Sequence, residues 1–251
     1  TQARSKLEYA VYNAAQGIIT TPIIKAEAMQ DARRVFAHKI VGAEFPNVKP
    51  ITQVPASDDI IFDENDINVV FTGLLYSDIR NPEYTLELFS RIQNPKLKLY
   101  LIGGGCPATV AKYKQIMGSR LIVNEGISMQ ASFNCMSKAD ILLNIGNTAT
   151  NQVPSKIFDY FSIGGPIVNV CKSRSCPTLP YVKHYPLSLN LFEEQNCLQQ
   201  QAEALEHFCV QKAGQKVPFA MTEKLYAPST AFYVAKQFHC ALTKPHTNRC
   251  K

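Results

Sequence analysis

The sequence contains no long hydrophobic run. Its apolar stretches at residues 140–145 and 166–170 fall far short of the roughly 18 residues that a membrane-spanning helix needs, and its first residues lack the pattern of a secretory signal. It also lacks any run of five basic residues, which argues against a nucleic-acid-binding arm. With 46% hydrophobic and only 18% charged residues, the chain is too apolar to be disordered. We therefore expect a globular protein with a core of its own.

Cysteine is present, but without the spacing of a metal site or a disulfide framework. The eight cysteines include no Cys-x2-Cys pair, and the sequence has no Asp-x-Asp motif that would hold a divalent cation. A zinc site at Cys171, Cys176 and His184 is an alternative that lacks a matching second pair. Sparse cysteines of this kind are typical of thiols in a reducing compartment. We expect a cytoplasmic protein without a bound metal.

Length and charge add two constraints. A chain of 251 residues allows one large domain, or one domain with part of another. The net charge of +6 is concentrated in the middle of the chain, where residues 67–192 hold 12 basic and 6 acidic residues. This excess suits an anionic ligand, although charge alone favours a solvated surface.

From residue 67 onward, short β-branched runs alternate with segments of helical period. Apolar residues on both faces of such strands favour a parallel sheet covered on both sides, a doubly wound, Rossmann-like α/β fold. Nine of the twelve glycines lie between Gly73 and Gly165, mostly just after strands, where such a sheet binds its ligand. The predicted strands are residues 67–72, 97–102, 120–124, 140–145, 166–170 and 187–192, and the predicted helices between the first five are residues 82–92, 108–117, 128–137 and 154–163.

The two ends of the chain follow other patterns. Leu7, Val11 and Ala14 have helical spacing, a strand is predicted at residues 17–20 and a helix at 21–36, and the proline-rich, acidic stretch 45–66 is typical of a linker. Leu198, Ala202, Leu205 and Cys209 predict a helix that Gly214 would end, and Pro228 begins a last helix. We expect three parts: residues 1–66 as the end of an N-terminal domain with a linker, 67–227 as the Rossmann-like domain, and 228–251 as a helix and tail.

The most informative stretch is residues 144–169. A strand ends in a loop of glycine and asparagine, Pro154 opens a helix, Ser155 and Lys156 lie in its first turn, and Asp159 follows. Free amides at a helix N-terminus bind phosphate, Lys156 adds positive charge, and Asp159 can accept hydrogen bonds from ribose hydroxyls. An ordinary helix start explains the same residues.

This stretch resembles the nucleotide-sugar site of family-4-like glycosyltransferases of the GT-B architecture. Those enzymes carry two acids separated by seven residues, then a helix and a Gly-x-Pro turn, and the matching positions here are Asn151, Asp159 and Gly164-Gly165-Pro166. The first glycine loop at residues 71–82 and the strand exits at 101–105 and 125–128 extend the resemblance, which covers about residues 67–243. The first 45 residues resemble the closing elements of the acceptor-binding domain.

The resemblance implies a role for each matching residue. Arg80 and Lys156 would stabilise the diphosphate leaving group, and Asn151 stands where the family has an acid close to the transferred sugar. Arg80 is alone in a loop where the family has an arginine and a lysine. The implied donor-binding residues are Gly73 at the diphosphate, Gly103 and Gly104 in a close-packed turn, Gly126 and Ile127 at the base, Val153, Pro154 and Ser155 at the phosphates, and Asp159 at the ribose.

The activity that follows is transfer of a sugar from a nucleotide-diphosphate sugar of the UDP or GDP type. The resemblance implies an acceptor glycan or lipid-linked glycan, a place in bacterial surface polysaccharide or glycoconjugate synthesis, and a metal-independent mechanism without a cofactor. Because the five histidines lie outside the donor loops, we expect the general base on an upstream domain. This chain alone would then bind nucleotide without transferring sugar, and the upstream half would provide any peripheral association with the inner face of the membrane.

Three alternatives remain open. A NAD-dependent dehydrogenase fragment would need Gly-x-Gly-x-x-Gly after the first strand, where the sequence has Gly73-Leu74-Leu75-Tyr76 instead. A non-catalytic nucleotide-sugar-binding module would explain the asparagine at position 151. A GT-B sugar-nucleotide epimerase would need catalytic acids and histidines that these loops do not contain.

Overall fold

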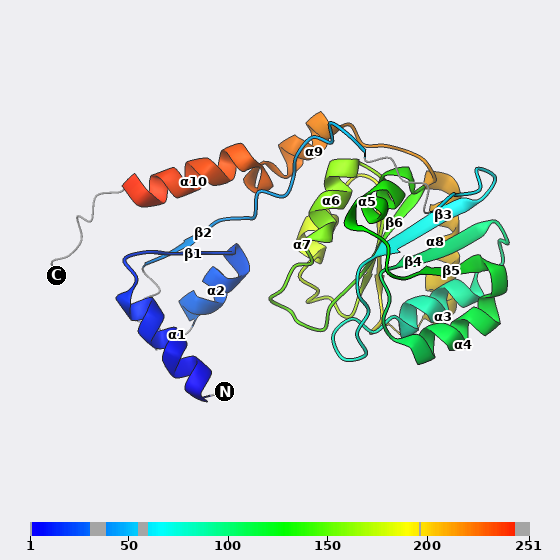
Figure 1. Ribbon diagram of the computed structural model, residues 1–251, viewed down its shortest axis with the longest axis horizontal. Helices are drawn as coiled ribbons and strands as arrows, with labels where there is room; N and C mark the ends of the chain where they lie inside the picture. Colours follow the sequence, from blue (N-terminus) through cyan, green and yellow to red (C-terminus); the bar gives the residue numbers. More distant parts are fainter. Residues whose placement is uncertain (1, 31–38, 55–59, 196, 244–251) are drawn as a thin grey trace. The chain divides into compact units, whose positions relative to one another are not determined.

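The computed structural model describes residues 2–30, 39–54, 60–195 and 197–243 of the chain. The chain divides into two compact units, which we call the small unit (Thr1–Lys49 with Tyr226–Lys251) and the large unit (Pro50–Leu225). Figure 1 labels helices and strands of both units. The domain boundaries drawn from the sequence at residues 66 and 227 remain a prediction.

The large unit is built on a six-stranded sheet in the order β5-β4-β3-β6-β7-β8, and every neighbouring pair of strands is parallel. This arrangement is the mostly parallel α/β fold predicted from the alternating pattern, and the strands lie within one residue of their predicted positions at each end. The strands are β3 (Ile67–Thr72), β4 (Leu97–Ile102), β5 (Leu121–Asn124), β6 (Ile141–Ile145), β7 (Ile167–Cys171) and β8 (Ser188–Phe192).

Helices cover both faces of this sheet. In Figure 1, α3, α4 and α8 lie on one side of it, and α5, α6 and α7 lie on the other. The helices are α3 (Glu83–Arg91), α4 (Pro107–Met117), α5 (Met129–Lys138), α6 (Lys156–Ile163), α7 (Leu179–Val182), α8 (Leu198–Lys212) and α9 (Phe219–Leu225), with a short 3-10 turn at Gly118–Arg120. The sequence pattern did not predict α7 or α9.

Alternation along the strands divides the core between the two faces. Val69 and Phe71 of β3 belong to the main apolar cluster, together with Leu86 of α3 and Leu205 of α8. Thr72, the residue after Phe71, faces the other layer, where its hydroxyl contacts the sulfur of Met136 in α5 at 3.0 Å. Burying both faces of every central strand removes a large apolar area from water and holds the carboxyl ends of the strands in a fixed array.

The small unit contains α1 (Gln2–Ala14), β1 (Ile18–Thr20), α2 (Pro22–Gln30), β2 (Ile40–Gly42), a 3-10 turn (Ala227–Ser229) and α10 (Ala231–Thr243). Strands β1 and β2 pair in parallel, and β2 was not predicted. The stripe predicted on α1 is not the buried one: Leu7 is 68% exposed, whereas Tyr9 and Tyr12 pack against the small core at Ala28 and Ile40. The predicted helix 21–36 is described only as far as Gln30.

Two further observations concern expectations from composition. Within the described residues, no helix combines the length and apolar character needed to cross a membrane. Part of the predicted linker packs closely, because Ile60 is buried and the ring of Phe62 meets that of Tyr100 in β4 edge-on, with centroids 4.7 Å apart.

Candidate functional site

The strand order reverses between β3 and β6, so the carboxyl ends of these two strands form the topological switch point of the sheet. The chain runs from β3 outward to β4 and β5, and then returns to the other side of β3 with β6. Loops that leave neighbouring strands in opposite directions open a cleft at this point, which is where doubly wound folds bind their ligands. The loop after β3 carries Gly73 and Arg80, and the loop after β6 carries Asn147 and Asn151.

Arg80 is held over this switch point by hydrogen bonds from its own side chain. Its Nε donates to Oδ1 of Asn147 at 2.9 Å, and its Nη1 donates to the carbonyl of Leu74 at 3.3 Å. Partial burial lowers the pKa of the Arg80 guanidinium from its ordinary value, and nearby Tyr160 and Tyr76 act in the opposite direction. An arginine remains charged at any physiological pH, so this position carries a fixed positive charge.

Asn147 is the partner that the sequence analysis missed. It is only 5% exposed, and it directly follows Gly146 at the end of β6. The two loops are joined again beside it. The amide of Thr148 donates to the carbonyl of Ile79 at 2.9 Å, and the hydroxyl of Thr148 donates to the backbone carbonyl of Asp78 at 3.2 Å. A polar side chain directly after a buried central strand is the signal that could have identified Asn147 from sequence.

Glycines let the loops after β3 and β4 pack against one another. Gly103 has φ +131°, and a Cβ there would lie 2.4 Å from the carbonyl oxygen of Gly73. At Gly105 a Cβ would lie 2.1 Å from the carbonyl oxygen of Leu75. The amide of Leu75 donates to the carbonyl of Gly104 at 2.9 Å. The structure therefore brings the predicted residues Gly73, Gly103 and Gly104 together with Arg80.

The loop after β5 lies farther from the switch point. Glu125 contacts the second loop, because a Cβ at Gly104 would lie 3.1 Å from its Oε1. Gly126 is exposed with φ +73°, and Ile127 is half-buried. Since β5 is separated from β3 by β4, the predicted residues Gly126 and Ile127 stand two strands away from Arg80. A ligand that touched both loops would extend across β4.

The start of α6 lies on the same edge of the sheet. Ser155 occupies the N-cap position, but its exposed hydroxyl makes no capping hydrogen bond. Lys156 and Asp159 form an ion pair one turn apart, with Nζ and Oδ2 separated by 3.7 Å and each side chain about one third exposed. Pro154 is buried, Val153 is half-buried and Asn151 is exposed. The predicted phosphate cation and ribose acceptor are therefore each other's partners in this state.

A row of asparagines, two of them buried and the third half-buried, supports the other half of the edge. Asn144, Asn169 and Asn190 are in register on β6, β7 and β8. The Nδ2 of Asn144 donates to Oδ1 of Asn169 at 2.7 Å, and the Nδ2 of Asn169 donates to Oδ1 of Asn190 at 2.8 Å. Buried polar groups with their hydrogen bonds satisfied fix a strand register more strictly than apolar packing does. Sequence reasoning treated these residues only as parts of strands.

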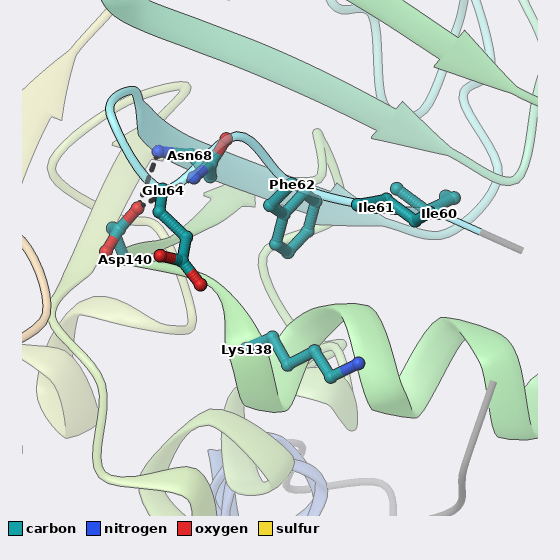
Figure 2. A pocket seen from close by; sticks show the side chains of 7 residues that line it. All are labelled: Ile60, Ile61, Phe62, Glu64, Asn68, Lys138 and Asp140. Carbon is teal, nitrogen blue, oxygen red and sulfur yellow. Dashed lines mark hydrogen bonds between the residues drawn. The ribbon is translucent and has the colours of Figure 1, made fainter. Parts of the chain in front are cut away.

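Figure 2 shows a pocket of about 620 Å³ at the opposite edge of the sheet. Ile60, Ile61 and Phe62 line one side of it, Glu64, Asn68 and Asp140 line the other, and Lys138 reaches it from α5. Asn68 is near the start of β3, and Asp140 directly precedes β6, so the pocket lies at the amino ends of the strands. It is a separate cavity from the predicted donor site.

The alternative zinc site is not assembled. Cys171 and Cys176 do lie together, but the described part of the chain contains no cluster of three or more histidine, cysteine, aspartate or glutamate side chains that could hold a metal. His184 does not complete the pair.

Comparison with known proteins places this geometry in a family of folds. No family model matches the chain, and no curated protein matches its sequence. Among solved structures, the apo form of the lipopolysaccharide outer core galactosyltransferase WaaB matches with a TM-score of 0.63 and 16% identity, covering 91% of this chain and 62% of that one. The chain has the fold of the GT-B glycosyltransferases.

Two further GT-B structures support this assignment. A glycosyltransferase from Rickettsia africae matches with a TM-score of 0.63 and 10% identity over 93% of this chain and 65% of that one. Sucrose-phosphate synthase from Thermosynechococcus elongatus matches with a TM-score of 0.56 and 16% identity over 96% of this chain and 60% of that one. The chain thus spans less than two thirds of each GT-B structure, and it matches their carboxyl-terminal domain. The fold class predicted from the sequence is confirmed.

Proposed function

We propose that this chain is the donor-binding half of a glycosyltransferase that uses a nucleotide-diphosphate sugar. The observation that carries the proposal is the charge of Arg80, held at the topological switch point by Asn147 and flanked by Gly73. Breaking the bond between the anomeric carbon and the diphosphate leaves two negative charges on the leaving group. A preorganised cation stabilises that charge as it develops.

The remaining predicted residues have roles in the same proposal. Lys156 provides a second cation once a diphosphate competes with Asp159 for it, and the released Asp159 then accepts hydrogen bonds from the ribose hydroxyls. Ser155 offers an uncommitted hydroxyl at the start of α6. Gly126 and Ile127, in the loop after β5, border the base. The nucleotide therefore extends across the end of β4, from the diphosphate at Arg80 to the base at this loop.

The acceptor in this proposal is a glycan or a lipid-linked glycan. One structure with this fold is described as acting in the outer core of lipopolysaccharide, which supports a place in bacterial surface polysaccharide or glycoconjugate synthesis. The proposed location is the cytoplasm, at the inner face of the membrane where a lipid-linked acceptor would be reached through an upstream domain. The proposed reaction needs no metal, and the general base belongs to that upstream domain.

Calorimetric titration of the full chain with UDP, GDP and ADP tests the donor site. We expect one of them to bind with a dissociation constant of about 1 μM to 1 mM, the ordinary range for such substrates. Arg80→Gln should weaken this binding by about 10- to 100-fold, because it removes a charge-assisted contact of roughly 1.5–3 kcal/mol. Arg91→Gln is the matched control, since Arg91 lies on α3 in an exposed ion pair with Glu87.

Two results would count against the donor site. One is the absence of binding to all three nucleotides by a chain that is folded by circular dichroism. The other is an equal effect of Arg80→Gln and Arg91→Gln, which would reduce the role of Arg80 to net charge. The contribution of Lys156 is tested separately, because Lys156→Ala should also weaken nucleoside-diphosphate affinity if it supplies the second cation.

A non-catalytic nucleotide-sugar-binding module is the second candidate, favoured by Asn151 in place of an acid. Both candidates predict nucleotide binding, so turnover distinguishes them. We expect this chain alone to bind without transferring sugar. Donor hydrolysis and transfer should appear only when an upstream acceptor-binding domain is joined to it. A joined protein that binds donor and still does not turn it over would favour the binding module.

A further inference from the structure

Two cysteines lie together where β7 ends. Cys171 is the last residue of β7, and Cys176 follows it after a short turn. They are 0% and 4% exposed. The Sγ of Cys176 and the Cα of Cys171 both lie beside Gly146, 3.3 Å and 3.5 Å from the position that a Cβ would take there. The proposed function uses neither residue, so the reason for placing two thiols side by side at the carboxyl edge of the sheet is open.

Polar neighbours hold each sulfur. The Nδ2 of Asn169 donates to Sγ of Cys171 at 3.2 Å, and Sγ of Cys176 lies 3.1 Å from the hydroxyl of Thr178. That hydroxyl also lies 3.0 Å from Oδ1 of Asn169. Asn169 of β7 and Thr178 at the start of α7 therefore link the two sulfurs through a chain of hydrogen bonds.

The same contacts make the two thiols chemically different. Interaction with the Cys171 thiol and hydrogen bonding to Thr178 and to the amide of Leu179 outweigh burial and lower the pKa of Cys176 to about 6. Interaction with the Cys176 thiol, together with burial, raises the pKa of Cys171 above its ordinary value. A thiolate that is stabilised next to a protonated thiol is the arrangement of an attacking and a resolving cysteine.

A small oxidant has a short path to this pair. Residues 173–175 form the turn between the two cysteines, and Arg174 and Ser175 are exposed. Within the turn the amide of Cys176 donates to the carbonyl of Ser173 at 3.1 Å, and the turn is held to the next segment by the amide of Arg174, which donates to Oε1 of Glu194 at 3.0 Å. Opening one surface turn requires far less free energy than global unfolding. Burial therefore slows access without preventing it.

From this geometry we infer that Cys171 and Cys176 are a reversible oxidation site, at which a hydroperoxide converts the two thiols into an intramolecular disulfide. The Cys176 sulfur attacks hydrogen peroxide, the O–O bond breaks, and hydroxide leaves and becomes water, so that Cys176 becomes a sulfenic acid. The Cys171 sulfur then attacks the Cys176 sulfur, the S–O bond breaks, and a second water leaves with the thiol proton. Two thiols lose two electrons, and one peroxide is reduced to two waters.

The reverse step needs an external dithiol. Its thiolate attacks one sulfur of the disulfide, and its second thiol resolves the mixed disulfide, so that the reagent is oxidised and both cysteines are recovered. The oxidised form places a covalent link beside Gly146, because a Cβ at Gly146 would lie 3.3 Å from the Cys176 sulfur. Gly146 precedes Asn147, so the site adjoins the loop that holds Arg80.

Peroxide titration of the full chain tests the inference. Samples are treated with increasing hydrogen peroxide, the remaining thiols are alkylated, and peptides are mapped by mass spectrometry. We expect a cross-link between Cys171 and Cys176 that has lost the mass of two hydrogens and is reversed by dithiothreitol. It should form about tenfold faster than oxidation of Cys240, an exposed cysteine on α10 that serves as the internal control.

Single variants identify the order of attack. In Cys171→Ser, Cys176 should stop at a sulfenic acid that dimedone traps, whereas in Cys176→Ser the residue Cys171 should react no faster than the buried Cys209. Recovery of both cysteines as free thiols at peroxide concentrations that oxidise Cys240 would overturn the inference. So would a disulfide to any other cysteine. The wild-type mapping decides the matter even if a variant does not fold.

Discussion

At the scale of single residues, the hydrogen bond between Arg80 and Asn147 explains why a charged side chain can sit partly buried at the centre of the sheet edge. The guanidinium loses hydration there, and burial lowers its pKa. The Oδ1 of Asn147 replaces one of the lost water contacts at 2.9 Å. Because Asn147 is itself buried, it cannot turn away, and the direction of Arg80 is set by a residue on the neighbouring strand's loop.

Asn147→Ala should therefore destabilise the protein by about 1–3 kcal/mol, because it leaves the Nε of a partly buried arginine without its partner. It should also weaken nucleoside-diphosphate binding, since Arg80 becomes mobile. Urea denaturation and calorimetry measure the two effects. Asn65→Ala is the control, because Asn65 bonds only to exposed Asp63 among the contacts described for it. A stability equal to wild type would show that Asn147 does not support Arg80.

Gly103 allows a second prediction at this scale. Gly103→Ala places a methyl group 2.4 Å from the carbonyl oxygen of Gly73 and forces alanine to φ +131°, so it should cost at least about 3 kcal/mol. Gly118→Ala separates the two causes, because Gly118 also has positive φ but has no atom within 4 Å of the added Cβ. Its cost should be about 1–3 kcal/mol, because only backbone strain remains. Equal costs in urea denaturation would mean that the backbone between the two loops yields to the added methyl.

Sequence reasoning identified the loops of the candidate site more fully than the contacts within them. Gly73 and Gly103 stood out because glycine after a strand has a local signature. Asn147 did not, because its importance depends on Arg80, which is 67 residues away in the chain. The same limit applies to Lys156 and Asp159, whose spacing suits both a ligand site and the ion pair that they form.

At the scale of elements, local pattern was sufficient wherever a strand is long and buried. The predicted bounds of β3 and β4 agree with the structure at both ends, because each is a run of six residues, five of them apolar or β-branched, that is followed by a glycine. β1 and β2 each have three residues, but only β1 is a run of three β-branched residues. β2 was missed because it has two and ends in Gly42, and because its pairing with β1 is non-local. α7 and α9, of four and seven residues, are too short for helical periodicity to show.

The start of α5 allows a direct test of a predicted helix signal. The hydroxyl of Ser128 accepts a hydrogen bond from the amide of Ala131 at 3.0 Å, as an N-cap should. Ser128→Ala should destabilise the protein by about 0.5–2 kcal/mol, whereas Ser128→Asp should restore most of the loss because its carboxylate caps and also faces the positive helix end. Thermal denaturation measures both. A loss of equal size in the aspartate variant would assign the effect to something other than capping.

The contact between α3 and α4 should give the protein a measurable acid sensitivity. The hydroxyl of Tyr113 donates to Oε2 of Glu87 at 2.7 Å, and this bond, with a second from Arg91, lowers the pKa of Glu87 below its ordinary value of 4.5. A carboxyl with a depressed folded pKa stabilises the protein above its unfolded pKa, and that stability is lost as the pH falls through the folded value. Solvent exposure limits the contribution to about 1 kcal/mol or less.

Glu87→Gln is the corresponding measurement. The difference in unfolding free energy between wild type and variant should be constant from about pH 5 to pH 8 and should shrink below the ordinary pKa of 4.5. Guanidinium denaturation at a series of pH values follows it, with Glu83→Gln as a control on the same helix in an exposed ion pair with Lys112. A difference that grew on acidification would contradict the assignment.

At the scale of the whole molecule, the large unit contains every element of the candidate donor site. The six-stranded sheet, both helical layers and all four loops lie between Pro50 and Leu225. The main apolar cluster draws on α3, α4 and α8 and on strands from β3 to β8, all within the same range. A core of this kind is the condition for independent folding. The small unit, in contrast, has a two-stranded sheet and a buried core of Ala28 and Ile40.

Residues 50–225, expressed alone, should therefore fold cooperatively and bind the same nucleotide as the full chain. We expect a single denaturation transition by both circular dichroism and tyrosine fluorescence, and a dissociation constant within about threefold of the full-chain value, because every side chain assigned to the donor lies in this range. Arg80→Gln in the fragment provides the negative control for binding. A folded fragment that does not bind would mean that the site needs residues of the small unit, and an unfolded fragment would show that the sheet alone does not specify the domain.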